Sequence, residues 1–219
     1  MAYPESRTPS IIHVYNKYLS GEYSSIDLDY LLQSISTADQ CPTFQVHPLG
    51  FIHGELSPCL PVSRGERFRL HIWLTNAGSL DQLGDLHEHT WNLTSLVLAG
   101  GLLDRNYEAI PTPRGAFSGA RIVYGPQNSA TPLGNYDLRL TKERTVSKGG
   151  VYSIPSRTIH INQITQIPTV TLVHSVEDGR GDGPLVLTPQ SVGQGFATGV
   201  RTEIDALDVL ARLRAAMDQ

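Results

Sequence analysis

Short apolar segments separated by turn-forming residues are the feature that most limits what this chain can fold into. The first segment, RFRLHIWL at residues 67–74, alternates polar and apolar side chains with a period of two, which is typical of a β-strand. Five more segments follow, each bounded by Gly, Pro, Asn or Asp: NLTSLVLAG, ARIVYG, NYDLRL, GGVYSIP and PTVTLVHS. Many short strands with frequent turns predict an all-β sandwich or barrel over residues 62–178.

Both flanking zones are expected to add a helix to this barrel. In residues 1–61, Ser24 and Ser25 can cap a helix whose apolar residues share one face. In residues 179–219, Thr202 can cap a second helix that ends near Met217. The apolar residues are Ile26, Leu28, Leu31, Leu32 and Ile35 in the first helix, and Ile204, Leu207, Leu210, Leu213 and Met217 in the second. The second apolar face must cover either the barrel or another subunit, so a homodimer is one expectation.

Charge and composition argue against several kinds of partner. The 219 residues include 17 Lys and Arg and 21 Asp and Glu, with no basic run, so we expect neither nucleic acid nor an anionic membrane as partner. No apolar stretch is long enough to span a bilayer and no signal peptide is visible, so we expect a cytoplasmic protein. Cys41 and Cys59 lack metal or redox spacing and are expected to be reduced thiols.

Three histidines form the clearest candidate site. His87 and His89 are two residues apart, so on a strand both side chains point to the same face. Residues 149–160 join a glycine turn, a strand and a proline turn to His160, and this compact element could bring His160 beside the first pair. Neutral imidazole is the commonest metal ligand near pH 7. The remaining histidines of the N-terminal zone are treated as non-ligands, namely His13, His47 and His53.

Together the two segments resemble the paired motifs of the cupin superfamily. His87 and His89 match the first motif, and Gly101 has the family spacing after the acidic position. The second motif is matched in spacing by Gly149, Pro155 and His160. This resemblance covers about half of the chain. It implies a single cupin barrel, a double-stranded β-helix or jelly roll, that holds one metal ion through the three histidines.

Two positions depart from the cupin motifs. Thr94 stands where the family has its acidic ligand, and Arg157 stands where the second motif has a glycine. A cupin shell that has lost its metal is one interpretation of these changes. Retention of all three histidines favours a changed site over a lost one.

The three-histidine set is similar to the thiol dioxygenase branch of the cupins, typified by cysteine dioxygenase, in which three histidines hold ferrous iron. The resemblance implies a mononuclear non-haem Fe(II) dioxygenase that acts on dioxygen and a small anionic substrate, such as a thiol, an amino acid or a carboxylate. Three neutral donors leave the charge of the cation uncompensated, which attracts anions. Ni, Mn and Zn are alternatives for the metal. A non-redox lyase or isomerase and a non-catalytic binding protein are alternatives for the function.

Four further residues are candidates for catalysis or substrate binding. Arg69 and His71 share one face of a strand with Trp73; amphipathicity alone turns this face outward, whereas the dioxygenase resemblance turns it toward the metal. If it is inward, Arg69 could bind a substrate carboxylate through two hydrogen bonds. The Thr94 hydroxyl could bond a metal-bound ligand. His174 lies within one residue of a histidine near the metal in that branch, and a slip of one residue would reverse its face.

Overall fold

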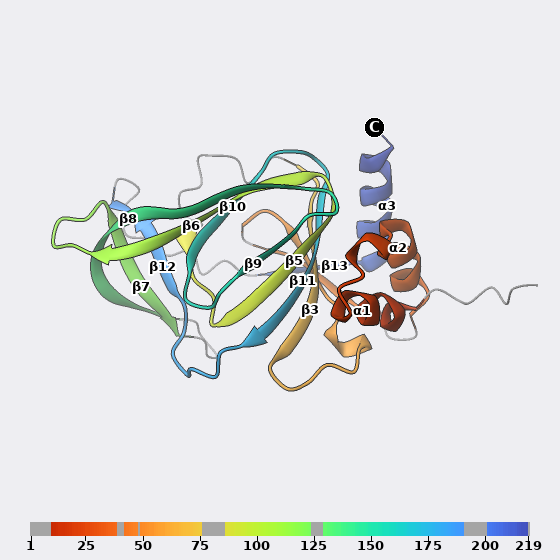
Figure 1. The fold of residues 1–219 in the computed structure, drawn as a ribbon, viewed down its shortest axis with the longest axis horizontal. Helices are drawn as coiled ribbons and strands as arrows, with labels where there is room; N and C mark the ends of the chain where they lie inside the picture. Colours follow the sequence, from red (N-terminus) through yellow and green to blue (C-terminus); the bar gives the residue numbers. More distant parts are fainter. Residues whose placement is uncertain are drawn as a thin grey trace, which may run out of the picture.

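The chain is mostly antiparallel β-structure with α-helices near both termini, as the sequence predicted (Figure 1). A computed structural model describes residues 10–38, 42–47, 49–75, 86–123, 129–190 and 201–218. Cys41 and residues 76–85 lie outside this part of the chain. None of the helices in the described ranges is long and apolar enough to cross a membrane.

The first sheet has seven strands in the order β13-β1-β2-β3-β11-β5-β9, and every neighbouring pair is antiparallel. Its strands are β1 (Thr43–Val46), β2 (Ile52–Glu55), β3 (Glu66–Trp73), β5 (Trp91–Ala99), β9 (Val151–Ile154), β11 (Thr169–Glu177) and β13 (Thr202–Ile204). Four of the predicted segments correspond to β3, β5, β9 and β11. Strands β1 and β2 come from the zone that the sequence assigned to an extension outside the barrel.

The second sheet closes on itself in the order β10-β4-β12-β7-β8-β6, with β10 paired to β6. Its strands are β4 (Leu86–His87), β6 (Gly101–Pro111), β7 (Phe117–Val123), β8 (Ser129–Ser147), β10 (Ile159–Ile164) and β12 (Leu185–Pro189). Strand β12 also lies beyond residue 178. The sheets therefore draw on residues outside the limits of 62 and 178 that the turn pattern suggested.

The N-terminal zone holds two α-helices, α1 (Ile11–Leu19) and α2 (Leu28–Ser36). Ser24 and Ser25 do not cap α2 as expected, because they lie in a short 3-10 helix, η1 (Tyr23–Ser25). The cap is Asp27, whose carboxylate accepts a hydrogen bond from the backbone N–H of Tyr30 at 3.0 Å. Helix α1 was not predicted. A second 3-10 helix, η2 (Ser57–Cys59), follows β2.

The C-terminal helix, α3, spans Ala206–Met217 and starts later than expected. Thr202 belongs to β13, and the cap is Asp205, whose carboxylate accepts hydrogen bonds from two backbone N–H groups of the first turn. The buried side chains of α3 are Ala206, Val209, Leu210 and Leu213. The expected stripe is therefore shifted, since Leu207 is 60% exposed and Met217 is 39% exposed.

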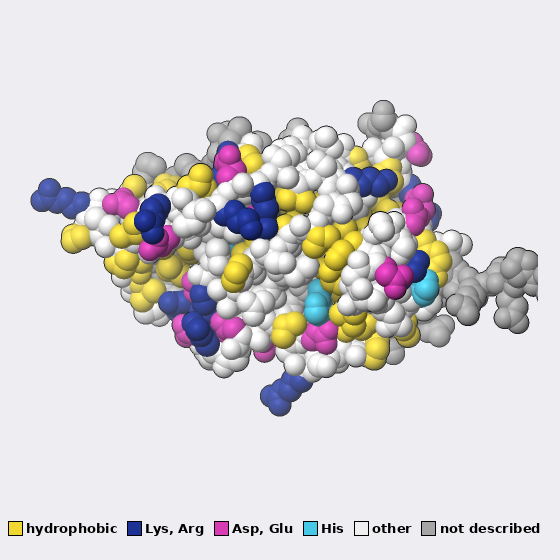
Figure 2. Space-filling model, viewed as in Figure 1, with side chains coloured by type: hydrophobic (Ala, Val, Ile, Leu, Met, Phe, Trp, Pro, Cys, Tyr) yellow, Lys and Arg dark blue, Asp and Glu magenta, His cyan; other side chains and the backbone are white. Residues whose placement is uncertain are grey.

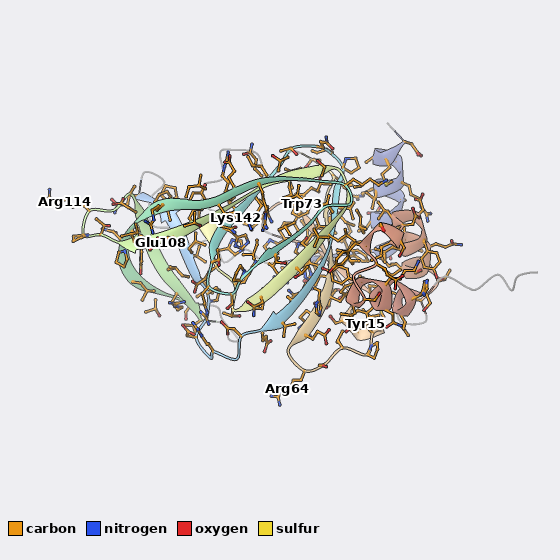
Figure 3. The ribbon with its side chains drawn as sticks, in the orientation of Figure 1. Tyr15, Arg64, Trp73, Glu108, Arg114 and Lys142 are labelled. Carbon is orange, nitrogen blue, oxygen red and sulfur yellow. The ribbon has the colours of Figure 1, made fainter. Side chains whose placement is uncertain are left out.

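The three helices cover the outer face of the first sheet (Figure 1). Phe68, Leu70 and Ile72 of β3 are fully buried there, in one cluster with the apolar side chains of all three helices. The alternate side chains of β3 must point to the other face of the sheet, away from the helices. Figure 3 shows Trp73 among the strands in the middle of the molecule, whereas Arg64 and Arg114 project from its edges.

The basic side chains on the surface shown in Figure 2 are scattered among acidic ones and form no single patch on that face. This distribution agrees with the absence of a Lys and Arg run in the sequence.

Candidate metal centre

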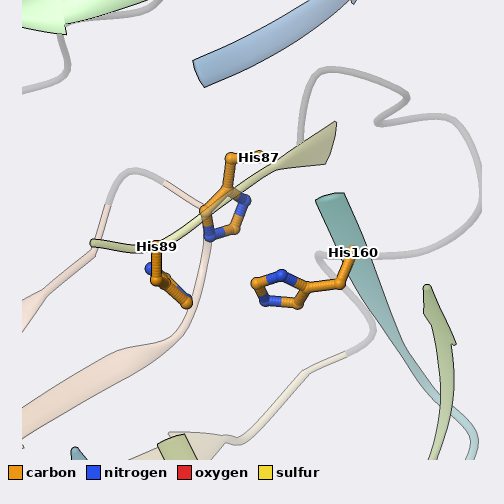
Figure 4. A group of neighbouring side chains, drawn as sticks. All are labelled: His87, His89 and His160. Carbon is orange, nitrogen blue, oxygen red and sulfur yellow. The ribbon is translucent and has the colours of Figure 1, made fainter. Parts of the chain in front are cut away.

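The structure brings His87, His89 and His160 together, as predicted. His87 is the last residue of β4 and pairs directly with His160 of β10, and His89 follows on the same side of the chain. One potential ligand nitrogen from each ring lies within 4.8 Å of the other two, and the ring centroids are 4.7–4.8 Å apart (Figure 4). His87 and His160 thus lie side by side although they are 73 residues apart in the sequence.

The protonation of these imidazoles suits metal binding. Burial, and then the proximity of His87, lowers the pKa of His160 to about 3, and burial holds the pKa of His89 well below its ordinary value. The Nδ1 atom of His160 lies 3.2 Å from the carbonyl oxygen of Thr158, which can only accept a hydrogen bond. The proton therefore sits on Nδ1, and the lone pair of Nε2 is left for a ligand bond. This donor set fits one divalent metal ion.

The closed antiparallel barrel and the meeting of the two motif segments across β4 and β10 agree with the motif resemblance. The fold is antiparallel β-structure with a closed sheet, as the cupin resemblance implies. Leu93, the residue before Thr94, lines the cavity beside the histidines.

Thr94 and His174 lie outside the cavity, which corrects two of the expected site residues. These residues are paired on neighbouring strands, so their side chains share the outer face of the sheet. The Thr94 hydroxyl is 3.0 Å from the hydroxyl of Ser153, and His174 Nε2 is 2.7 Å from a carboxylate oxygen of Glu66. In each case a shift of one residue along a strand reverses the face.

Arg69, His71 and Trp73 line the cavity, so the orientation implied by the dioxygenase resemblance is the one observed. Amphipathicity alone fails here because the apolar face of β3 is covered by helices outside the barrel. The Nε atom of Arg69 lies 3.3 Å from Glu55, and its Nη1 donates to the hydroxyl of Ser175 at 3.3 Å. Much of the charge of Arg69 is therefore balanced inside the protein before any ligand arrives.

Trp91 connects Arg69 to the candidate ligands. Its indole stacks on the imidazole of His89 with centroids 4.7 Å apart and planes at 17°, and the Arg69 guanidinium lies 5.2 Å from the indole centroid. Such contacts restrict the rotation of the His89 ring and place a cation–π pair on the cavity wall. Trp91 is thus positioned to fix one of the three imidazoles.

Strand β2 and the residue before it supply a group of cavity residues that sequence reasoning missed. Phe51, His53 and Glu55 alternate along the chain and all line the cavity, together with His47 and Arg201. Burial lowers the pKa of His53 to about 4. The period-two spacing of these residues was a usable signal, but the Pro-rich surroundings masked it.

The cavity bounded by these side chains has a volume of about 190 Å³. His71 lies opposite His53 on adjacent strands, with ring centroids 5.5 Å apart. Burial also keeps the pKa of His71 well below its ordinary value, so both rings are neutral at pH 7. The arrangement provides a three-nitrogen metal site at one side of the cavity and neutral hydrogen-bonding groups at another.

Arg157, at the glycine position of the second motif, has a structural explanation. Its φ is +63°, the left-handed conformation that ordinarily favours glycine. Its backbone N–H donates to the carbonyl of His89 at 2.8 Å, and its Nη1 donates to Glu88 at 3.2 Å. Its other guanidinium nitrogens bond Asp178 at 3.0 Å and Asp182 at 2.8 Å. The side chain thus joins the turn before His160 to the segment that carries His87 and His89.

Comparison with known proteins gives distant structural likenesses. No known family and no curated protein matches the sequence. A structure of hydroquinone 1,2-dioxygenase is similar at 10% identity and a TM-score of 0.33, covering 54% of this chain and 61% of that one, so the chain spans about three fifths of its length. A structure of DMSP lyases is similar at 16% identity and a TM-score of 0.41, covering 84% of this chain and 85% of that one.

A third similar structure is hydroxypropylphosphonic acid epoxidase from S. wedmorenis, at 11% identity and a TM-score of 0.36, covering 75% of this chain and 82% of that one. With TM-scores below 0.5, none of these likenesses establishes what this chain does.

Proposed function

We propose that the chain is a metal-dependent enzyme, a mononuclear non-haem Fe(II) oxygenase that acts on a small anionic substrate. The observation that carries the proposal is the convergence of three imidazoles, from His87, His89 and His160, on the wall of one cavity. Three neutral donors leave a divalent cation with its charge uncompensated and with open coordination positions. Other divalent ions, such as Ni, Mn or Zn, are compatible with the same donors.

When bound, ferrous iron would supply Lewis acidity and a place for dioxygen beside the substrate. The residues of the chain have three tasks around it. The three imidazoles would hold the ion, Trp91 restrains His89, and the cavity wall holds the substrate beside the ion. Arg69 and His71 face the same space and orient an anionic substrate through hydrogen bonds.

One observation favours a second candidate function, a non-redox lyase or isomerase. His53 and His71 are neutral imidazoles on the cavity wall, and a neutral imidazole can accept a proton from a substrate. In that reaction the metal would only polarise the substrate. Dioxygen would not be consumed.

Oxygen uptake separates the two candidates. Protein loaded anaerobically with Fe(II) is mixed with small thiols, amino acids and carboxylates, and dioxygen is followed with an electrode while products are followed by mass spectrometry. The proposal expects one substrate class to consume dioxygen in proportion to product. The His160→Ala protein should consume none above the rate of free iron.

Product formation without oxygen uptake would overturn the oxygenase proposal in favour of the lyase or isomerase. Protein that binds no divalent metal would overturn both. His13→Ala is the matched control, because His13 is an exposed histidine on α1, away from the cavity.

A further inference from the structure

Ring side chains form a continuous wall on the β2–β3 side of the cavity. Phe51 is central: its ring centroid is 4.8 Å from that of His71, 5.1 Å from that of Trp73 and 4.3 Å from that of His47. The planes of Phe51 and His47 differ by 15°, whereas those of Phe51 with Trp73 and His71 differ by 35° and 43°. We call the set Phe51, His71 and Trp73 the ring wall.

The charges around the cavity favour an anion over a cation. Among the described residues, the charged side chains that line the cavity are Arg69, Arg201 and Glu55, so with the histidines counted as uncharged their formal charges add up to +1. A divalent ion at the three histidines would add to this positive charge. Aromatic cages that bind ammonium groups need the opposite balance, so an organic cation is disfavoured here.

The histidine end of the cavity and the ring wall favour different parts of a ligand. The face of an aromatic ring carries negative charge density, so a carboxylate is repelled by the ring faces of Phe51 and Trp73 and attracted to the three histidines and Arg69. A flat π-system packs against tilted rings better than a puckered aliphatic one, because edge-to-face and offset contacts become available. An acidic group at the metal and a flat body at the ring wall satisfy both ends.

The volume of the cavity is sufficient for a body of one ring. A cavity of about 150 Å³ is sufficient to bind benzene. The cavity here has about 190 Å³, which leaves room for one six-membered ring and a small acidic group.

We propose that this cavity binds a small carboxylic acid built on a single aromatic ring, with its carboxylate toward His87, His89 and His160 and its ring against the ring wall. The inference rests on the proposed function, because it uses the same metal site as the anion-binding end. It narrows the substrate class and moves it away from aliphatic amino acids such as cysteine.

The chain carries its own reporters for a binding test. Its two tryptophans, Trp73 and Trp91, both line the cavity. Full-length protein loaded with Zn(II), which is redox-inactive, is titrated with benzoate and with cyclohexanecarboxylate, which has the same charge and a similar size but a saturated ring. Tryptophan fluorescence and isothermal calorimetry measure each dissociation constant. We expect benzoate to bind about 3- to 10-fold more tightly, in the range that one or two aromatic contacts give.

Cyclohexanecarboxylate or cysteine binding as tightly as benzoate would overturn the inference, as would tighter binding of tetramethylammonium. The Phe51→Leu protein keeps an apolar side chain but removes the central ring, so its preference for benzoate should fall to about 2-fold or less. Thermal unfolding checks that this variant is folded. The preference in the unmodified protein tests the inference even if the variant is unstable.

The outcomes also separate this inference from the proposed function. The ring preference should persist in metal-free protein at weaker affinity, because the ring wall does not depend on the metal. If the protein binds no metal but keeps the preference, only the proposed function fails. If it binds metal and shows no preference, only this inference fails.

Discussion

The guanidinium of Arg157 lies 3.2 Å from the carboxylate of Glu88, and this pair links the two segments that carry all three candidate ligands. Glu88 stands between His87 and His89 but points to the opposite face of the strand. The same Glu88 oxygen also accepts hydrogen bonds from Arg121 Nη1 at 2.6 Å and from the backbone N–H of Leu185 at 3.1 Å. The ion pairs of Glu88 with Arg121 and Arg157 therefore support the segment that carries His87 and His89.

Removing the Arg157 side chain should loosen this support without breaking the turn. In Arg157→Gly, glycine accepts the positive φ, so the turn is retained while the bonds to Glu88, Asp178 and Asp182 are lost. We expect Zn(II) affinity, measured by competition with a chelator, to fall about 10- to 100-fold, which is typical when partners of metal ligands are removed.

Arg64→Gly is the matched control for that substitution, because Arg64 is an exposed arginine in a turn and projects from the edge of the molecule (Figure 3). It should leave Zn(II) affinity unchanged. Unaltered affinity in folded Arg157→Gly protein would show that the ion-pair network does not support the metal site.

An acid introduced at Leu93 should act on the metal, whereas one at Thr94 should not. Leu93→Glu places a carboxylate on the cavity wall, where it can become a fourth ligand and compensate the charge of the cation. We expect tighter Zn(II) binding, by at least about 10-fold, and weaker binding of anionic ligands. Thr94→Glu should change neither quantity, since this position faces away from the cavity. Chelator competition measures the Zn(II) affinity of both proteins. A larger change in affinity in Thr94→Glu than in Leu93→Glu would contradict the observed strand register.

The free energy of unfolding of the metal-free protein should fall as the pH drops from about 6.5 to about 4. Burial, followed by the nearby Arg69, lowers the pKa of His53 to about 4 in the folded protein. The unfolded chain takes up a proton near pH 6.5 and the folded chain only near pH 4, so protonation favours unfolding in this window. One such group contributes roughly 3 kcal/mol across the window.

Urea unfolding at pH 7 and pH 4.5 measures this loss, and the glutamine variant His53→Gln isolates the histidine. Other groups titrate in the same window, so the comparison is between the pH slopes of the two proteins. The slope of His53→Gln should be shallower. Equal slopes would mean that His53 is not held neutral by the fold.

Several strands and the His87–His89 pair could be predicted because their signals are local, whereas His160 was added through the paired cupin motifs. Alternation with a period of two identified β3, and spacing alone paired His87 with His89. The inward face of β3 could not be derived in the same way. Its apolar residues, such as Leu70, are buried against helices outside the barrel, whereas its polar residues line the cavity. The usual rule that apolar residues face a barrel interior fails when a second layer covers the outside.

Positions that depend on register or on distant segments were the ones missed. The sequence motifs assigned Thr94 and His174 to the cavity, and each assignment was wrong by one residue. A motif spacing can vary by one residue, whereas a shift of one residue along a strand turns the side chain to the opposite face. His53 was set aside because it lies in a short strand within a Pro-rich region. The role of Arg157 depends on acidic residues more than 20 positions away, which no local pattern connects to it.

The central claim is that His87, His89 and His160 bind one divalent metal ion. Its most direct test is the stoichiometry of bound metal, measured by elemental analysis after anaerobic loading with Fe(II) and removal of free ions. We predict about one ion per chain in the unmodified protein and in His174→Ala, whose histidine lies outside the cavity, and less than about a tenth of that in His160→Ala. Metal content in folded His160→Ala equal to that of the unmodified protein would contradict the account.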